Sequence, residues 1–309
     1  MPPNIRKLPN DLALKAQNTI NEDDERISED LKSIRNWLTK QPHLNVRNDD
    51  QWLLTFLRGC KYSLERTKEK LDTFYMLRTL IPEFFKNKDP TQPELKALID
   101  NGLFLPLENK TDPTGPCLLF FKQGDYDPTK VDIVDIFKYL FIILDILMYE
   151  DDNLSVSGLV VICDLKGVTL THMAQFTPGL AKKSVSTVQI GYPIRQKGVH
   201  FINTPAGFDT LFSLLKAFAS EKLKKRYHVH KTIDSLYKFI PKENFPMELG
   251  GSIPMDEMKE KWRIKIASYK NWLIEDEQYY SDEKLRLGKS KTAESLFGIE
   301  GSFRKLNID

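Results

Sequence analysis

FINTPAGFDTLFSLLKAFASEKLKKR, residues 201–226, is the stretch around which the rest of this chain is organised. We expect its first three residues to end a strand, and a helix to begin with Thr204 as the N-cap and Pro205 at the first helical position. The apolar side chains of this helix spread over roughly 160°, wider than the ~100° stripe that seats a helix on one core. They are Phe208, Leu211, Phe212, Leu214, Leu215 and Phe218. Two surfaces can therefore compete for the helix.

The same helical arc continues into positive charge. On a helical wheel, Lys222 and Arg226 point in the same directions as the apolar residues, and Lys224 and Lys225 lie beside them. An apolar helix with a basic end suits a membrane surface. It equally suits a core helix whose last turn carries cations that complement the helix dipole. These residues alone leave both interpretations open.

Composition indicates a folded chain with a large core. The 309 residues are 41% hydrophobic and 28% charged, and the net charge of +2 gives no overall attraction for nucleic acid. The longest apolar run, residues 139–149, is too short to span a bilayer and contains Asp145. The N-terminus lacks the apolar core of a signal peptide. The three cysteines are widely spaced, which predicts neither disulfides nor a metal site and favours a reducing, cytoplasmic setting.

The chain divides by pattern into four parts. Residues 1–22 are a polar N-terminal segment in which only residues 11–20 could be helical. Residues 23–94 are expected to form a small all-helical module, with helices ending near Lys40, Gly59 and Leu80 and a proline-rich boundary after them. The third part, residues 95–280, is an α/β domain that closes with a long amphipathic helix from Asp256 to Tyr280. Residues 281–309 are a polar tail expected to dock only partly.

Short apolar runs define the strands of the third part. They are residues 117–122, 158–165, 198–203 and 227–230. Helices are predicted between them at residues 128–150 and 170–188, the second interrupted at residues 177–179, in addition to the opening helix. Continuous apolar strands separated by helices predict a mainly parallel sheet with right-handed crossovers. The fold class is therefore α/β.

Catalytic and metal-binding patterns are missing from the sequence. There is no phosphate-binding glycine loop, no nucleophile elbow and no zinc-protease motif, which argues against the common enzyme classes. His228 and His230 share a strand face, but no further ligand is spaced to join them. His172 and Asp164 are expected to be structural, as a hydrogen-bonded ring and a turn cap. Asp145 predicts either a basic or hydroxyl neighbour or a polar group at the edge of a cavity.

Apolar side chains from many separate elements are expected to converge on one face of the sheet. Such a set is usually core, although a wide apolar helix beside it could instead enclose a ligand. The converging residues are Phe137, Phe141, Ile142, Cys163, Phe176, Val188, Ile194 and Val199.

Several ordered motifs resemble one family. FLRGCKYSLERT, residues 56–67, is similar to the N-terminal helical module of CRAL-TRIO proteins. CDLKGV at 163–168, PIRQKGVHFINTP at 193–205 and LGG at 249–251 resemble the lipid-binding domain of that family. The resemblance covers about residues 25 to 280 and is closest to the branch of α-tocopherol transfer protein, cellular retinaldehyde-binding protein and the clavesins. It implies a carrier with a deep apolar pocket, a mobile gate helix and a basic cleft for phosphatidylinositol bisphosphate headgroups.

The resemblance assigns roles to individual positions. The gate would be residues 205–219, and its membrane-facing side chains would be Leu211, Leu214 and Phe218. The basic cleft would consist of Arg195, Lys197, Lys222 and Arg226. The pocket would add Asp145, Phe208, Phe212 and Leu215 to the converging residues. Two departures weaken the match: Cys60 stands where the family often has a second arginine, and Gly207 replaces a larger apolar residue.

The function implied is that of a cytoplasmic, peripherally membrane-associated carrier of a hydrophobic small molecule, such as a retinoid, a tocopherol or a carotenoid. Its partners would be that ligand and a phosphoinositide-containing membrane surface, with no nucleic acid, no metal and no cofactor beyond the bound lipid, and the protein would be a monomer. The alternative is a phosphoinositide-binding adaptor with little cargo transport. An enzyme acting on lipids is the third possibility, and the missing catalytic motifs argue against it.

Overall fold

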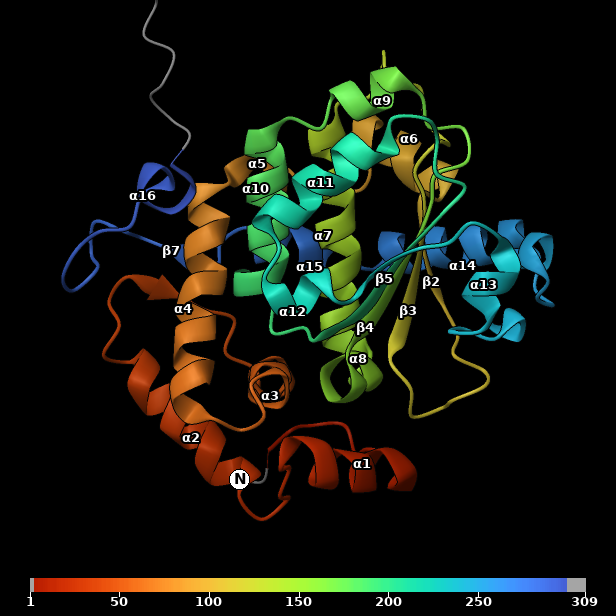
Figure 1. Cartoon of the computed structure of the whole chain (residues 1–309). Coiled ribbons are helices and arrows are strands. Elements are labelled where there is room, and N and C mark those ends of the chain that lie inside the picture. Colours follow the sequence, from red (N-terminus) through yellow and green to blue (C-terminus); the bar gives the residue numbers. More distant parts are fainter. Residues whose placement is uncertain (1–2, 299–309) are drawn as a thin grey trace, which may run out of the picture.

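A five-stranded sheet divides the protein into two layers of helices (Figure 1). The computed structural model describes residues 3–298. In the strand order β2-β3-β4-β5-β6, the last four strands are parallel, and β2 pairs antiparallel with β3. The strands are β2 (Phe104–Leu107), β3 (Cys117–Lys122), β4 (Leu159–Asp164), β5 (Gln196–Ile202) and β6 (Tyr227–Val229). The mainly parallel sheet predicted from the sequence is confirmed, and β2 is an addition that the sequence analysis missed.

Both faces of the sheet are covered, which explains why its strands are apolar throughout instead of alternating. One face packs against α7 (Ile133–Glu150) and α11 (Phe208–Phe218), with α10 (Pro178–Ser186) beside α11. The other face packs against α13 (Ile233–Tyr237) and α14 (Met255–Ser268). Two separate apolar layers result, and only the first contains the candidate site.

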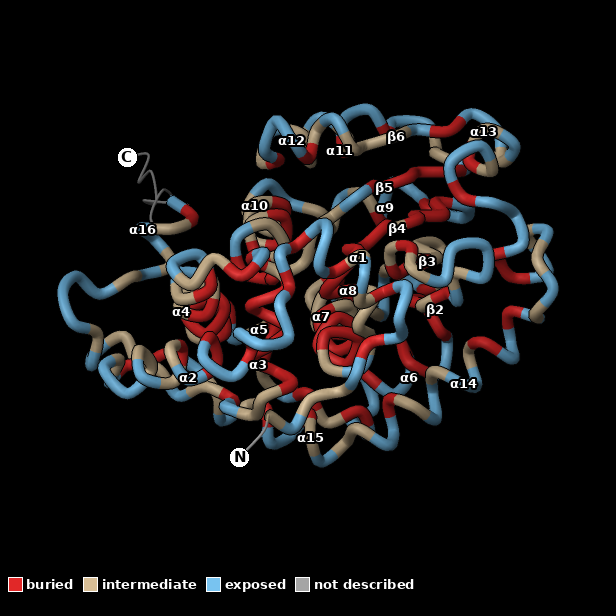
Figure 2. The backbone as a smooth tube through the Cα atoms, turned by 90° about the horizontal axis from the view of Figure 1, so that it is seen from below, coloured by how far each residue is buried: buried red, intermediate tan, exposed pale blue. Residues whose placement is uncertain are grey.

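The N-terminal helices share one continuous core with α7. They are α1 (Asn10–Ile20), α2 (Ile27–Leu38), α3 (Asp50–Gly59), α4 (Leu64–Leu80) and α5 (Pro82–Phe85). Asp49 caps α3 by accepting a hydrogen bond from the Trp52 amide at 2.9 Å. The proline-rich boundary is not an open linker, because Phe84 and Phe85 are buried against Phe141. In Figure 2, α4, α5 and α7 all carry buried residues.

Short elements complete the chain. They are β1 (Leu44–Asn45), α6 (Pro93–Asn101), α8 (Asp152–Ser157), α9 (Leu170–Ala174), the π-helical turn Thr187–Gly191, α12 (Glu221–Lys224), the 3-10 turns Lys242–Asn244 and Met247–Leu249, α15 (Lys270–Asp276), β7 (Tyr280–Ser281) and α16 (Ala293–Phe297). β1 pairs antiparallel with β7, so the end of the α/β part is joined to the helical part.

The opening helix differs from its prediction at both ends. It begins at Phe208 instead of Pro205, because the Pro205 carbonyl is used in a turn to the Phe208 amide and Gly207 takes a left-handed conformation at φ 84°. It ends at Phe218, and Ser220 then caps the separate helix α12. Lys222 and Arg226 therefore do not continue the face of α11, and the predicted basic end of the same helix is wrong.

The C-terminal part also departs from expectation. The single helix predicted for residues 256–280 is two helices, α14 and α15, which break at Tyr269. Part of the predicted polar tail is ordered: Phe297 of α16 is buried, and Lys182 of α10 donates a hydrogen bond to its carbonyl oxygen. The remainder of that tail, residues 299–309, and residues 1–2 of the N-terminal segment lie outside the described residues.

Candidate functional site

A cavity of about 190 Å³ lies between the sheet and the helices α7, α10 and α11. The strands contribute alternate side chains to its wall, as the pleat of a sheet requires. From the strands these are Leu119, Phe121, Leu159, Val161, Cys163, Val199 and Phe201. The helical walls carry Ile136, Phe137, Val185, Phe208, Leu211 and Leu215. The lining is almost entirely apolar, and burial raises the pKa of the Cys163 thiol to about 12, so the thiol is neutral at physiological pH.

Seven of the twelve residues predicted for the pocket line this cavity. They are Phe137, Cys163, Phe176, Val188, Val199, Phe208 and Leu215. They come from six separate segments of the chain, and the sheet and its helices bring them together. The convergence of these side chains on one sheet face is what the buried strands and the flanking apolar helices predicted.

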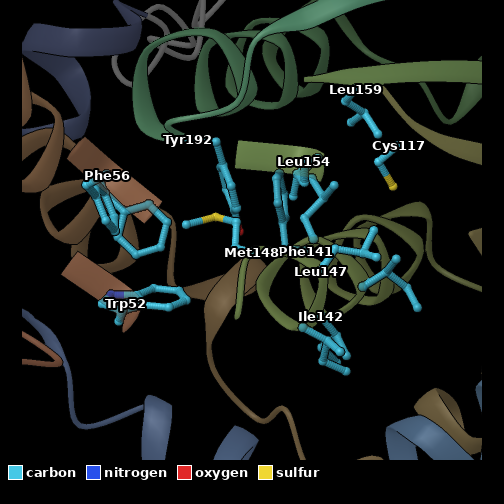
Figure 3. Packing of buried hydrophobic residues seen from close by; sticks show 14 of the residues in the cluster. Trp52, Phe56, Cys117, Phe141, Ile142, Leu147, Met148, Leu154, Leu159 and Tyr192 are labelled. Atoms are coloured by element: carbon cyan, nitrogen blue, oxygen red, sulfur yellow. The ribbon is translucent and has the colours of Figure 1, made fainter. Parts of the chain in front are cut away.

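Five predicted pocket residues lie elsewhere. Phe141 stacks on Tyr192 at 5.5 Å between ring centroids, and with Ile142 it belongs to the core shared with the N-terminal helices (Figure 3). Ile194 packs against the same core. Phe212 packs between the rings of Phe201 and Tyr227, beside the cavity. The sequence correctly predicted that these residues are apolar members of buried elements. It did not predict that their side chains point away from the cavity.

Asp145 is the fifth, and it is fully buried in an ionic network. Its carboxylate contacts the Arg78 guanidinium at 3.0 Å and the Lys88 ammonium at 3.2 Å, and it accepts a hydrogen bond from the Tyr192 hydroxyl at 2.8 Å. Asp276 shares Arg78 and Lys88. Burial alone would raise the pKa of Asp276, but these cations hold it at about 2. The prediction of a cavity-edge carboxylate at position 145 is wrong, and the alternative of basic and hydroxyl neighbours is confirmed.

Helix α11 forms one wall of the cavity. Phe208, Leu211 and Leu215 point inward and line it, whereas Leu214 and Phe218 are half-buried. Leu211 was predicted to face a membrane, and the structure instead places it inside at 8% exposure. The apolar side chains of the helix therefore extend beyond the three that line the cavity, in keeping with the wide arc seen in the sequence.

Positive charge gathers where β5 enters the sheet. Lys197 is exposed there, although part of its side chain is buried. Its pKa is lowered by this partial burial and by the charges of Arg195, Arg226, Lys61 and Lys15. A depressed lysine pKa of this origin means that cations crowd one another. Among residues 3–298, none of Lys197, Lys61, Lys15 or Arg226 has a carboxylate within 4 Å. We call these four residues with Arg195 the basic cluster.

Arg195 has a structural role within the basic cluster. Its terminal nitrogens donate hydrogen bonds to four backbone carbonyls, those of Arg58 at 2.7 Å, Gly59 at 3.1 Å, Val156 at 2.7 Å and Ser155. These bonds tie α3 and α8 to the start of β5. Arg195 therefore contributes its charge to the basic cluster, but its two terminal nitrogens already donate their hydrogen bonds to backbone carbonyls.

The remaining predicted cations differ in position. Arg226 donates a hydrogen bond to the Gln196 carbonyl and lies beside Lys197. Lys222 is exposed on α12 and is not among the charges that act on Lys197. Cys60, at the position of the missing arginine, is buried, and its Sγ lies 3.5 Å from the Arg66 carbonyl. Lys15 of α1 joins the cluster from far away in the sequence, and no sequence signal could have identified it.

The histidines are paired with protein groups. His200 Nδ1 lies 2.8 Å from His230 Nε2, and His230 Nδ1 lies 3.0 Å from the Ser235 hydroxyl, while the His228 ring stacks on His200. His172 hydrogen-bonds the Thr169 amide and the Tyr126 carbonyl, which is the structural role predicted for it. Within the described part of the chain, no group of three or more metal-ligating side chains is arranged to hold an ion.

Comparisons with known proteins agree with this architecture. Residues 102–251 match the CRAL/TRIO domain, and residues 23–95 match the Pinta-like UBA domain. An alpha-tocopherol transfer protein-like protein from Mus musculus is 32% identical over 250 residues, which cover 80% of this chain and 72% of that protein. Clavesin-1 from Rattus norvegicus is 29% identical over 246 residues, which cover 79% of this chain and 69% of that protein.

A solved structure extends the comparison to the fold. The crystal structure of Sfh5 superposes with a TM-score of 0.52 at 16% identity, covering 88% of this chain and 100% of that one. Between residues 3 and 298, none of the helices is both long enough and apolar enough to cross a membrane.

Proposed function

Because this chain belongs to the CRAL-TRIO family, we propose that it is a non-enzymatic carrier of a hydrophobic small molecule such as a retinoid, a tocopherol or a carotenoid. The carrier works in the cytoplasm and exchanges its cargo at membranes that contain phosphoinositides. The observation that carries the proposal is the apolar cavity closed on one side by α11. A cavity of this kind takes a ligand by removing apolar surface from water.

The energetics of α11 favour exchange at a membrane. If the helix swings away, Phe208, Leu211 and Leu215 leave the cavity. Exposing them to water costs about 2 kcal/mol each, roughly 6 kcal/mol together. A lipid surface receives the same side chains at little cost, and Leu214 and Phe218 of the same helix are already half-buried rather than fully covered. Opening therefore occurs preferentially when the protein is bound to a membrane.

The basic cluster supports the membrane half of the proposal. Unpaired cations near an anionic leaflet contribute about 1 kcal/mol each, and the attraction acts within a Debye length. Lys197 and Arg226 carry this role in the cluster, and Lys222 adds a further exposed cation on α12, the helix that follows α11.

Charge reversal tests the membrane half. The double variant Lys222→Glu with Arg226→Glu is expected to lose the preference for vesicles containing phosphatidylinositol bisphosphate over neutral vesicles, measured by co-sedimentation at low salt. Lys284→Glu with Lys289→Glu makes the same change of net charge on the segment between β7 and α16 and is expected to keep that preference. Equal loss in both variants, or no loss in the first, would contradict a specific headgroup site.

Native mass spectrometry of the purified protein tests the cargo half. A stoichiometric apolar ligand, lost when α11 is disrupted by Leu211→Asp, is the expected result. The alternative function is a phosphoinositide-binding adaptor with little cargo transport, which the basic cluster alone could serve. Strong vesicle binding by a protein that neither carries nor takes up any apolar ligand would favour that alternative.

A further inference from the structure

A π-helical turn, Thr187–Gly191, continues α10 and lies beside the end of α11. The Tyr192 amide donates to the Thr187 carbonyl, five residues back, at 3.3 Å. Turns of this kind are rare in helices and are frequently found at functional sites. Val188 of this turn lines the cavity, whereas Ile190 is exposed, so the turn forms part of the outer wall of the cavity.

Gln189 of this turn holds the junction between α11 and α12. Its side-chain nitrogen donates to the Phe218 carbonyl at 3.1 Å, and its side-chain oxygen accepts a hydrogen bond from the Ser220 amide at 2.9 Å. Phe218 is the last residue of α11, and Ser220 is the cap of α12. Backbone groups at helix ends lack partners within their own helix. One side chain therefore satisfies a backbone group on each side of the break.

The break itself consists of extended backbone. Ala219 has ψ 140°, and Ser220 has φ −63° and ψ 155°, so neither residue continues a helix. At the other end of α11, Gly207 is left-handed. A helix bounded by two non-helical segments can move as a unit when those segments change their dihedral angles. The two bonds to Gln189 oppose such a movement at the C-terminal end of α11.

Lys70 of the helical part fixes the turn that carries Gln189. Its ammonium donates to the Ile190 carbonyl at 2.7 Å and to the Gln189 carbonyl at 3.3 Å. These carbonyls lie at the C-terminal end of a helix, where a cation also complements the helix dipole. Packing is close as well. A Cβ added to Gly191 would lie 2.6 Å from Cδ1 of Leu77, which like Lys70 belongs to α4, so only glycine lets the turn lie here without moving that side chain.

We propose that Gln189 is the latch that keeps α11 closed over the cavity, and that Lys70 of the helical part positions this latch. The inference rests on the proposed function and deepens it, because it assigns the control of the wall through which cargo would pass. The C-terminal end of α11 cannot swing outward without breaking both bonds to Gln189. The helical part thus acts on the cavity through α4 and the π-helical turn, although none of the described lining residues belongs to it.

Hydrogen exchange tests the latch directly. Gln189→Leu removes both hydrogen bonds at similar side-chain size. The Ser220 amide and the last turn of α11 are expected to exchange at least about fivefold faster than in the wild type, the effect of two hydrogen bonds at their weakest. Gln175→Leu is the matched control, because Gln175 also donates two hydrogen bonds to backbone carbonyls, those of Pro128 and Val131. It should leave exchange in α11 unchanged, and equal acceleration in both variants would overturn the assignment.

A second pair of variants cuts the latch without changing Gln189. Ser220→Pro removes the amide hydrogen that the Gln189 oxygen accepts, and φ −63° at this position already suits proline. Ala219 before it is extended, as proline requires. Ser220→Ala keeps the amide and loses only the side-chain cap of α12, which the proline variant loses too. We expect faster exchange in the last turn of α11 with proline alone. Equal exchange in the two variants would refute the latch even if Gln189→Leu failed to fold.

The positioning role of Lys70 is tested by coupling. Lys70→Met keeps the apolar stem, and it is expected to accelerate exchange of the same amides at least about twofold. Lys68→Met on the same helix removes an ion pair with exposed Glu65 and should change nothing. If Lys70 acts through Gln189, the double variant Lys70→Met with Gln189→Leu exchanges no faster than Gln189→Leu alone. Effects that multiply in the double variant would contradict this role.

Cargo uptake connects the latch to the cavity. Wild-type and Gln189→Leu proteins are incubated with phosphatidylcholine vesicles that contain tritium-labelled retinol, α-tocopherol or β-carotene, one label per experiment, and are re-isolated by gel filtration. The variant is expected to take up the label that the wild type accepts at least about fivefold faster, because opening breaks the same two bonds. Faster exchange at Ser220 with unchanged uptake would refute control of the cavity and leave the carrier function intact. Uptake of no label by the wild type would overturn the carrier function, while hydrogen exchange would still decide the latch.

Discussion

The carboxylate of Asp145 shows how single residues hold the two parts of this protein together. It lies in α7, and its partners Arg78 and Lys88 come from α4 and from the segment after α5. A buried pair is not in itself strongly stabilising, because its desolvation offsets much of its attraction. Removing one partner is a different matter, since the other charges remain buried and uncompensated.

Asp145→Asn is therefore expected to lower the free energy of unfolding by about 3–5 kcal/mol. It leaves Arg78 and Lys88 with only Asp276 to balance them. Urea denaturation followed by circular dichroism measures the change. Glu108→Gln breaks an exposed ion pair with Lys261 and serves as the control, with an expected change below about 0.5 kcal/mol. Similar losses in the two variants would contradict the role of burial.

His200 makes stability depend on pH. Burial, together with His228 and His230, lowers its pKa from 6.5 to about 4. As pH falls below about 6.5 the unfolded chain binds a proton that the folded protein does not, so the free energy of unfolding decreases, by at most about 1.4 kcal/mol per pH unit. The loss continues until pH reaches about 4. His200→Gln is expected to flatten this dependence in urea titrations between those pH values, and an unchanged slope would refute the explanation.

Residues such as these mark the limit of sequence reasoning. The sequence offered two interpretations of Asp145 and could not choose, because its partners are 57 and 67 positions away. Side-chain direction was equally inaccessible at Phe141 and Phe212, since α7 is apolar almost all round and the apolar arc of α11 is wider than one core-facing stripe. The register shift at the start of β5, where Val160 of β4 pairs with Gly198 so that Lys197 is skipped, likewise has no sequence signature.

At the scale of elements, α11 is defined by its two ends. Gly207 starts it in a left-handed conformation, and Ser220 caps the next helix after a break. The replacement of a larger apolar residue by Gly207, noted in the sequence, is explained by that backbone conformation. The sequence predicted β3 to the residue and located the other parallel strands closely, because buried strands bounded by turns are strong signals. Helix ends were less accessible, since Thr204-Pro205 is an equally good helix start in isolation.

Gly207→Ala is expected to loosen the start of α11. A non-glycine residue in the left-handed region costs about 1–2 kcal/mol. The variant should show faster amide hydrogen exchange in the first turn of α11 and faster cargo exchange with vesicles. Gly288→Ala imposes the same backbone strain at φ 96°, where no heavy atom lies within 4 Å of the added Cβ, and should leave α11 unchanged. If the amides of α11 exchange as slowly in the Gly207 variant as in the wild type, the conformation of Gly207 does not control the start of this helix.

At the scale of the whole molecule, the helical and α/β parts are continuous. One apolar cluster extends from Leu8 through Trp52 to α7 and Leu273. The sequence divided the chain at a proline-rich boundary because composition changes there, but composition does not show that Phe84 and Phe85 are buried across that boundary. The basic cluster is likewise a property of the assembled chain, with contributions from α1, the segment after α3, the start of β5 and the residue before β6.

Unfolding is therefore expected to be a single cooperative transition. Tryptophan fluorescence, which reports on Trp52 in the helical part and Trp262 near the α/β part, and circular dichroism should give coincident urea curves. Differential scanning calorimetry should give one peak whose calorimetric and van't Hoff enthalpies agree. Two separated transitions would show that residues 23–94 are an independent folding unit.

The pairing of β1 with β7 has a consequence for the synthesis of this protein. Leu44 pairs with Ser281, and Asn45 pairs with Tyr280. At about 5–20 residues per second, a ribosome makes the second strand roughly 10–50 seconds after the first. The helical part thus leaves the ribosome well before the chain that completes it. During that interval its uncovered apolar surface is accessible to chaperones. We therefore expect chaperones to bind mainly to the first ninety residues of the nascent chain.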